Sequence, residues 1–269
     1  MTPPIPVLLY HSVTDDPSPA LGRYTLHPQQ FEAHVRIIAD QGWRVLTIEQ
    51  LGDAIDDESV QSVPTLAITF DDGFADTYEE AAPVLAGYGF GATLYVTTGT
   101  VGRSCNWLGG AGERAMASWK QLDDLAAAGW EIGAHSVDHP ELDVLSKEAC
   151  RAQIAQSRES LQQHLGLPIH SFAYPHGYHG ARVRDQVVAA GYRSACAVKN
   201  ALSSAVDDPM ARARLTVTSE TSADDLGRLL AEARTGCAHV ATRHELRRTA
   251  MWRGYRKLRH VVVSAGARS

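Results

Sequence analysis

The chain has 269 residues, of which 44% are hydrophobic and 21% charged, a composition typical of a folded globular protein and not of a disordered one. Its net charge of −6 argues against nucleic acid as a partner. No run of about 18 apolar residues occurs, so the sequence predicts no transmembrane helix. The first residues, MTPPIPVLLYHSV, lack the basic start of a signal peptide, and we therefore expect a cytoplasmic protein.

Strands and helices alternate along the body of the chain. In chain order, the sequence predicts a strand at 5–13, a helix at 27–43, strands at 44–48 and 64–70, a helix at 79–89, a strand at 91–99, a helix at 119–129, a strand at 130–135, a helix at 147–165, a strand at 170–175, a helix at 181–191, strands at 193–198 and 213–218, and a helix at 222–234. This alternation indicates a parallel sheet covered by helices. Seven or so strands favour a closed or nearly closed barrel, although alternation alone does not exclude an open sheet.

Local signals support several of these boundaries. Ser118 and Gln121 have the spacing of a capping box for the helix at 119–129. Ser146 is placed to cap the long helix, which Gly166 and Pro168 should end. The four cysteines form no paired motif, so we expect isolated thiols at Cys105, Cys150, Cys196 and Cys237.

The last part of the chain differs from the rest in charge. Residues 239–269 hold eight Lys or Arg and one Glu, a net of +7, so the remainder carries −13. We place one domain at 1–238 and a basic tail, predicted to be helical, at 239–269. Because Trp252, Tyr255, Leu258 and Val262 lie among its basic residues, the tail could contact an anionic membrane surface or pack as an ordinary terminal helix.

Metal-binding or acid–base side chains follow four of the predicted strands. In parallel α/β folds the reactive site forms at the carboxyl ends of the strands. Reading only those ends gives His11, the pair Asp71 and Asp72, the pair His135 and His139, and the segment YPHG at 174–177. We expect these side chains to converge on one edge of the sheet.

The segment HSVDH contains two histidines four residues apart, His135 and His139. Such a pair can present two imidazole nitrogens to one ion, and catalytic zinc typically takes three protein ligands and keeps a position for water. A carboxylate would complete the set. Taken alone, the two histidines could equally lie beside a surface turn.

The segment ITFDDG places Asp71 and Asp72 side by side at the end of a strand. A divalent cation would offset their repulsion if one were a ligand and the other a general base. Gly73 permits the sharp turn this needs, although a solvated turn would have the same sequence.

His11, at the end of the first predicted strand, is a candidate general acid because its reference pKa is about 6.5. The alternative role for His11 is that of a structural, hydrogen-bonded histidine.

The combined motifs TFDDG at 69–73, HSVDH at 135–139 and FAYPHG at 172–177 resemble those of the polysaccharide deacetylase family, also called carbohydrate esterase family 4. The resemblance covers roughly residues 5–220. It implies a distorted barrel of about seven strands and helices, and hydrolysis of the N-acetyl groups of amino sugars in a polysaccharide, oligosaccharide or glycolipid. Some members with this fold cleave O-acetyl esters or cyclic amides instead, and an inactive sugar-binding protein is a further alternative.

The resemblance also implies roles for individual residues. Asp71 would be the general base, and Asp72, His135 and His139 would bind the metal, usually Zn²⁺ but in some cases Co²⁺ or Ni²⁺. The segment Tyr174, Pro175 and His176 would line the sugar site, with the backbone N–H of His176 facing the oxyanion.

Two departures from the family pattern concern the acid and the arginine that holds the base. No clear C-terminal Leu-x-His motif supplies the acid, but the opening LLYHSV is similar to that of circularly permuted members, which implies His11 as the acid. Many members have an arginine beside the base where this chain has Ala173. We expect Arg214 to replace it beside the base, at the substrate site.

Overall fold

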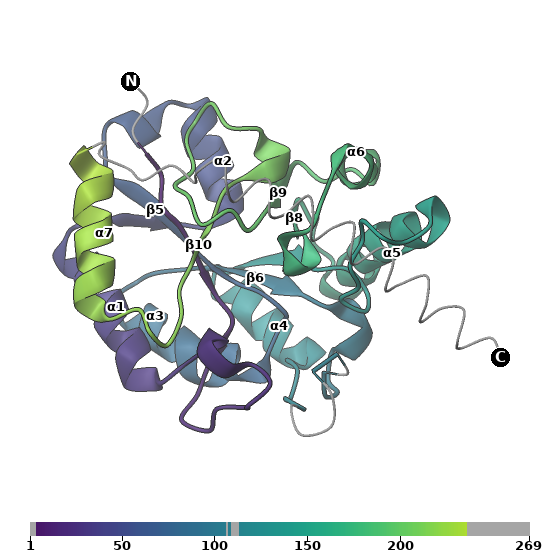
Figure 1. Cartoon of the computed structure of the whole chain (residues 1–269), viewed down its shortest axis with the longest axis horizontal. Helices are drawn as coiled ribbons and strands as arrows, with labels where there is room; N and C mark the ends of the chain where they lie inside the picture. Colours follow the sequence, from purple (N-terminus) through teal and green to yellow (C-terminus); the bar gives the residue numbers. More distant parts are fainter. Residues whose placement is uncertain (1–3, 106, 109–112, 236–269) are drawn as a thin grey trace.

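The computed structural model describes residues 4–105, 107–108 and 113–235 (Figure 1). These residues form a single α/β domain. The basic tail at 239–269, its helical structure and its membrane contact lie outside the described residues and stay predictions. Within the described part of the chain, no helix combines the length and apolar character needed to span a bilayer.

A curled sheet of eight parallel strands forms the centre of the domain. Its order is β10-β1-β5-β6-β7-β8-β9, with β4 pairing only with the first half of β5. The strands are β1 (Val7–Tyr10), β4 (Arg44–Leu46), β5 (Thr65–Phe70), β6 (Thr93–Val96), β7 (Glu131–Ala134), β8 (Ser171–Ala173), β9 (Ser194–Cys196) and β10 (Leu215–Thr216).

The sheet curls until its two edges nearly meet. Arg212, three residues before β10, bridges Cys196 of β9 in parallel, through backbone bonds of 2.9 Å from Arg212 to Ala195 and from Ala197 to Arg212. The predicted distorted barrel is therefore confirmed. Because all strands run in the same direction, their carboxyl ends share one rim.

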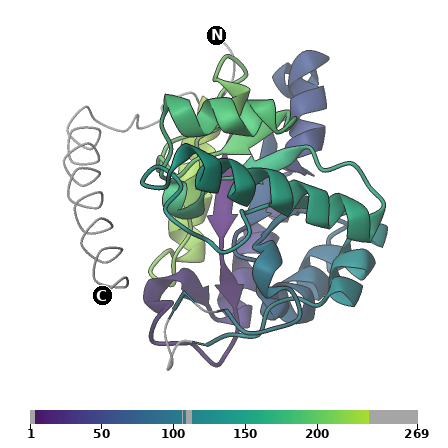
Figure 2. The same ribbon diagram turned by 90° about the vertical axis from the view of Figure 1, so that its right-hand side faces the viewer.

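Six helices lie on the outside of the barrel, and Figure 2 shows the side on which α5 and α6 lie. They are α1 (Pro28–Asp40), α3 (Ala82–Gly87), α4 (Trp119–Ala127), α5 (Lys147–Leu165), α6 (Ala181–Ala189) and α7 (Ala223–Thr235). The predicted caps are present: Ser118 and Gln121 form a capping box, Ser146 accepts from the Ala149 N–H, and Gly166 ends α5 at φ 65°.

A seventh helix, α2 (Ile48–Asp56), lies at the amino ends of the strands and was not predicted from the sequence. Its N–H at Ile48 donates to Thr93 Oγ1 (2.9 Å), and its apolar face packs in one cluster with Val7 and Ala67. The strand predicted at 44–48 is correspondingly shorter than expected. A two-strand ladder of β2 (Ser12–Val13) and β3 (Thr25–Leu26) was also not predicted.

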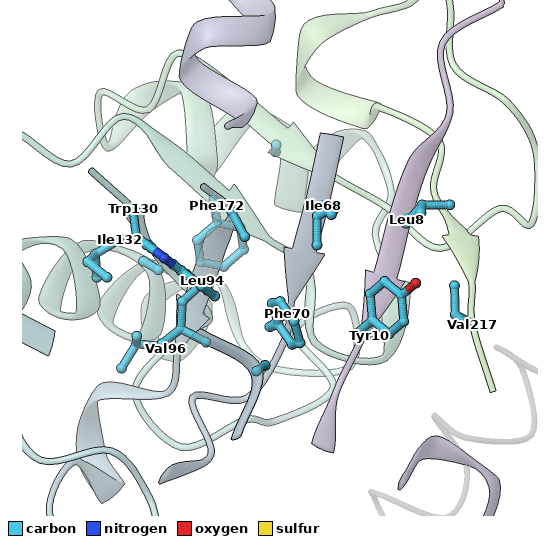
Figure 3. Close-up of a cluster of buried hydrophobic side chains, with 14 of the residues drawn as sticks. Leu8, Tyr10, Ile68, Phe70, Leu94, Val96, Trp130, Ile132, Phe172 and Val217 are labelled. Carbon is cyan, nitrogen blue, oxygen red and sulfur yellow. The ribbon is translucent and has the colours of Figure 1, made fainter. Parts of the chain in front are cut away.

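Strand side chains alternate between the helices and the barrel interior. Tyr10, Ile68, Phe70, Leu94 and Phe172 belong to the core between sheet and helices (Figure 3). Since successive side chains point to opposite faces, the residues between them on β1 and β5 point inward. Asp71 follows Phe70 at the end of β5, and by the same alternation its side chain points to the barrel interior.

Candidate active site

The rim at the carboxyl ends of the strands surrounds a cavity of about 280 Å³. Its walls include six of the predicted site residues: His11, Asp71, Asp72, His135, His139 and His176. A larger groove of about 890 Å³ on the outer surface is lined by parts of α3 and α4, and none of these six residues contributes to it. The chemistry-bearing side chains thus converge at the rim, as expected.

Asp72, His135 and His139 form the one group of three potential metal ligands found in the described residues, with ligand atoms within 4.8 Å of one another. Asp72 Oδ1 lies 3.2 Å from His139 Nε2 and 3.5 Å from His135 Nε2. The Nδ1–H of His135 donates to the Ala173 carbonyl oxygen (2.8 Å), which leaves its Nε2 lone pair directed at the group.

The charge state of this group also suits a cation. Burial raises the pKa of Asp72, but His139 and His135 more than offset it and hold that pKa well below its usual range. His139 Nδ1 is buried without a hydrogen-bond partner among the described residues. Two imidazoles and one carboxylate match the donor set of catalytic zinc sites, so these residues fit a divalent metal.

Unusual backbone conformations concentrate at this rim. Six non-glycine residues of the described chain have positive φ, and four of them are Asp72 (75°), Ser136 (67°), His139 (57°) and His176 (58°). Such conformations cost about 1–3 kcal/mol each and cluster at functional sites. At Asp72 the turn breaks strand alternation, and as a result two consecutive carboxylates line the same cavity.

Asp71 forms a buried, bidentate ion pair with Arg214. The guanidinium Nη1 and Nη2 lie 2.6 and 2.7 Å from the two carboxylate oxygens. Arg214 also donates to Thr69 Oγ1 and to the Ala197 carbonyl oxygen, both at 3.2 Å, and lies over the ring of Tyr95. Burial raises the pKa of Asp71, but Arg214 and His135 outweigh it, so the pKa lies below its usual value.

Three residues expected at the substrate site are not part of the cavity wall. Arg214 lies beside Asp71, where it was expected, but it is fully buried and does not line the cavity. Tyr174 is also fully buried, and its hydroxyl donates to the Met210 carbonyl oxygen because its side chain faces the helix layer. Pro175 is buried as well. Of the YPHG segment, only His176 contributes its side chain to the cavity in this structure.

His11 lies beside Asp71 because of the strand register. β1 pairs with β5 up to Tyr10 and Phe70, and the Asp71 N–H donates to the Tyr10 carbonyl oxygen (3.1 Å). Burial lowers the pKa of His11, while Asp72 and Asp71 oppose that shift. Its Nδ1 is buried and has no hydrogen-bond partner in the described part of the chain.

Aromatic side chains also form part of the cavity wall, which was not predicted from the sequence. Tyr24, Trp107 and Tyr178 line the cavity together with the histidines. The Trp107 ring stacks on His139 at a centroid distance of 4.8 Å, and Tyr24 lies 5.0 Å from His11. A tryptophan inside a glycine-rich loop after a strand was the available signal.

Comparisons with known proteins agree with this site. The sequence model of the polysaccharide deacetylase family matches residues 59–195. The Bacillus subtilis protein YxkH, named as a candidate polysaccharide deacetylase, is 27% identical over 189 residues, which is 70% of this chain. The match spans only 62% of that relative's own length.

Solved structures share the fold. The Streptococcus pyogenes deacetylase PplD superposes with a TM-score of 0.74 at 23% identity, covering 85% of this chain and 98% of the other. A de-N-acetylase from Aggregatibacter actinomycetemcomitans gives a TM-score of 0.70 at 20% identity, covering 83% and 98%. With the family match spanning about half of its length, the chain belongs to the polysaccharide deacetylase family.

Proposed function

We propose that the protein removes N-acetyl groups from an N-acetylated amino sugar in a polysaccharide, oligosaccharide or glycolipid, and releases acetate. The observation that carries this proposal is the buried Asp71–Arg214 pair beside the Asp72, His135 and His139 group in one cavity. The structural similarity to a de-N-acetylase supports hydrolysis of an amide over an ester.

Asp72, His135 and His139 would hold a divalent metal, for which we propose Zn²⁺, with Co²⁺ or Ni²⁺ as alternatives. When bound, such an ion lowers the pKa of water and polarises a carbonyl group. The protein's own contribution is to fix the ligands, since the Ala173 carbonyl oxygen holds the His135 ring in one tautomer and orientation.

Asp71 acts as the general base in this proposal and accepts a proton from the attacking water. Its lowered pKa keeps it ionised at neutral pH. The two bonds from Arg214 fix the direction of the carboxylate, and positioning of this kind is a large part of a base's effect. The backbone N–H of His176 is the proposed donor to the oxyanion.

His11 then protonates the departing amine. Nitrogen is a poor leaving group, so amide cleavage needs an acid in addition to the base. His11 lies next to Asp71 in the strand register and lines the same cavity. The aromatic rings of Tyr24, Trp107 and Tyr178 would contact the sugar.

Two substitutions separate the roles of the paired aspartates. Asp72→Asn should abolish both zinc retention, measured by elemental analysis, and acetate release from N-acetylated glucosamine oligomers. Asp71→Asn should lose acetate release and keep zinc. Asp123→Asn, an exposed carboxylate on α4, is the matched control and should change neither. Acetate release by Asp71→Asn at the rate of the unsubstituted protein would rule out the assigned base.

Location and substrate form remain part of the proposal. We propose a cytoplasmic protein, and if the basic tail at 239–269 binds anionic lipid, a lipid-linked amino sugar becomes the favoured substrate. Flotation with anionic liposomes would compare the full chain with one that ends at residue 238. If neither protein floated with the liposomes, a soluble substrate would be favoured.

A further inference from the structure

Asp76, four residues after Asp72, is a buried carboxylate that connects three loops at the rim. It is 7% exposed. Its Oδ2 accepts from the Ser12 hydroxyl (2.5 Å) and from Arg114 Nη2 (3.2 Å), and its Oδ1 accepts from the Val13 N–H (3.3 Å). All three donors come from segments distant in sequence.

Arg114 extends this connection to the loop that follows β2. Its Nη1 donates to the Asp16 carbonyl oxygen (2.7 Å) and lies 3.7 Å from the Asp16 carboxylate. The segment around Arg114 is itself fixed to the chain near Asp76, because the Ala75 N–H donates to the Ala115 carbonyl oxygen (2.9 Å). Asp76 and Arg114 therefore join the loop that carries His11 to the loop that carries Asp71 and Asp72.

This connection has a direct consequence for His11. Its Nδ1 has no hydrogen-bond partner among the described residues, so no such bond orients the ring at that nitrogen. The backbone of His11 is instead fixed on one side by Tyr10 in the sheet, and on the other by Ser12 and Val13 on Asp76. Tyr24, whose ring packs on His11, lies next to β3, which pairs with β2.

We infer that Asp76 is a positioning residue, which holds the imidazole of His11 where it can protonate the leaving amine. The inference rests on the proposed function, in which His11 is the acid. Asp76 does not line the cavity, and it acts only through Ser12 and Val13.

The leaving group of the substrate separates this role from a purely structural one. An amine must be protonated to depart, whereas the phenolate of p-nitrophenyl acetate leaves as the anion and needs no acid. A misplaced His11 should therefore slow amide hydrolysis and spare ester hydrolysis. A general acid typically contributes about 10²- to 10⁴-fold to the rate, so partial misplacement should cost about tenfold or more in kcat.

Asp76→Asn is the informative variant. An amide offers one acceptor oxygen in place of two, so it cannot accept from Val13, Ser12 and Arg114 together. We expect kcat for the amide to fall about tenfold or more, kcat for the ester to stay within about threefold, and zinc content to be unchanged. His11→Ala should show the same selectivity more strongly. Ser12→Ala removes a single bond to Asp76 and should give a smaller loss of the same kind, even if Asp76→Asn folds poorly.

The control is Ser146→Ala, which removes the cap of α5 and leaves the rim untouched, and its amide-to-ester ratio should be unchanged. A second readout needs no substrate: the NMR signal of the His11 imidazole should shift in Asp76→Asn and not in Ser146→Ala. An unchanged ratio together with an unchanged signal would overturn the inference, as would equal loss of both activities with loss of zinc. If the unsubstituted protein released no acetate from any amide, the proposed function would fail, and the NMR comparison would still decide the role of Asp76.

Discussion

Replacing Arg214 with methionine should leave the Asp71 carboxylate buried without a counter-ion. The substitution removes the two bonds of 2.6 and 2.7 Å to Asp71 and keeps a side chain of similar length in the barrel. Asp71 is 3% exposed, so water can replace the lost guanidinium only in part. Breaking a buried ion pair by removing one partner costs about 3–5 kcal/mol, and we expect a loss of that size in the free energy of unfolding.

The carboxylate's charge should account for most of this loss. Asp71→Asn in the Arg214→Met background removes the unpaired charge, so the double variant should be more stable than Arg214→Met alone. In the unsubstituted protein the pKa of Asp71 is lowered, so its stabilising contribution is present above the unfolded pKa of about 3.9 and is lost only as the pH falls through the lower folded value. Without Arg214, burial would be opposed mainly by His135, and the pKa of Asp71 should rise. The destabilisation should then be smaller at pH 4.5 than at pH 7.

Urea unfolding at both pH values, with a chelator present, measures these differences, because a bound cation would itself compensate Asp71. A loss below about 1 kcal/mol for Arg214→Met at pH 7, or no recovery on adding Asp71→Asn, would contradict the assigned ion pair. With zinc restored, acetate release by Arg214→Met should fall by about 10²-fold or more, since the base is no longer held in place.

Three further changes test other parts of the fold. His34 is fully buried and burial lowers its pKa, so the protein should lose up to about 1.4 kcal/mol per pH unit below about pH 6.5, and His34→Gln should reduce this slope in urea unfolding. Gly133→Ala would place a Cβ 2.6 Å from the Tyr95 ring, and calorimetry should show a loss of about 1–3 kcal/mol. Ser146→Ala should cost about 1 kcal/mol through the lost cap of α5. Equal slopes in the first case, or unchanged stability in the other two, would refute the respective argument.

The sequence predicted those features that depend on neighbouring residues. Strand–helix alternation, the capping box at Ser118 and the left-handed end of α5 at Gly166 are local, and the structure has each of them. The convergence of the rim residues was also predictable, because parallel strands place their carboxyl ends on one side. α2 was missed although Thr47 and Gln50 form a capping box, because the apolar run before it favoured a continuing strand.

The direction of individual side chains was harder to predict. Tyr174 follows β8 at the rim, and its position suggested a sugar contact, yet strand alternation turns it toward the helices. Asp72 shows the opposite case, because a positive φ brings it to the cavity where regular alternation would turn it away. Loops that come together only in the folded chain, such as those bearing Tyr24 and Trp107, leave no periodic signal in the sequence.

Closure of the barrel explains how Arg214 can hold Asp71 although the residue at the usual arginine position is Ala173. In a closed sheet the interior face of every strand looks toward the same axis, so a long side chain can reach Asp71 from more than one strand. Arg214 directly precedes β10, which pairs with β1 next to β5, and its Nε–H bonds to Ala197, just past the end of β9. Ala173 contributes only a small side chain to the interior, while its carbonyl oxygen orients His135. The ion pair is therefore maintained by position in the barrel and not by position in a sequence motif, so a motif search alone would miss the residue that holds the proposed base.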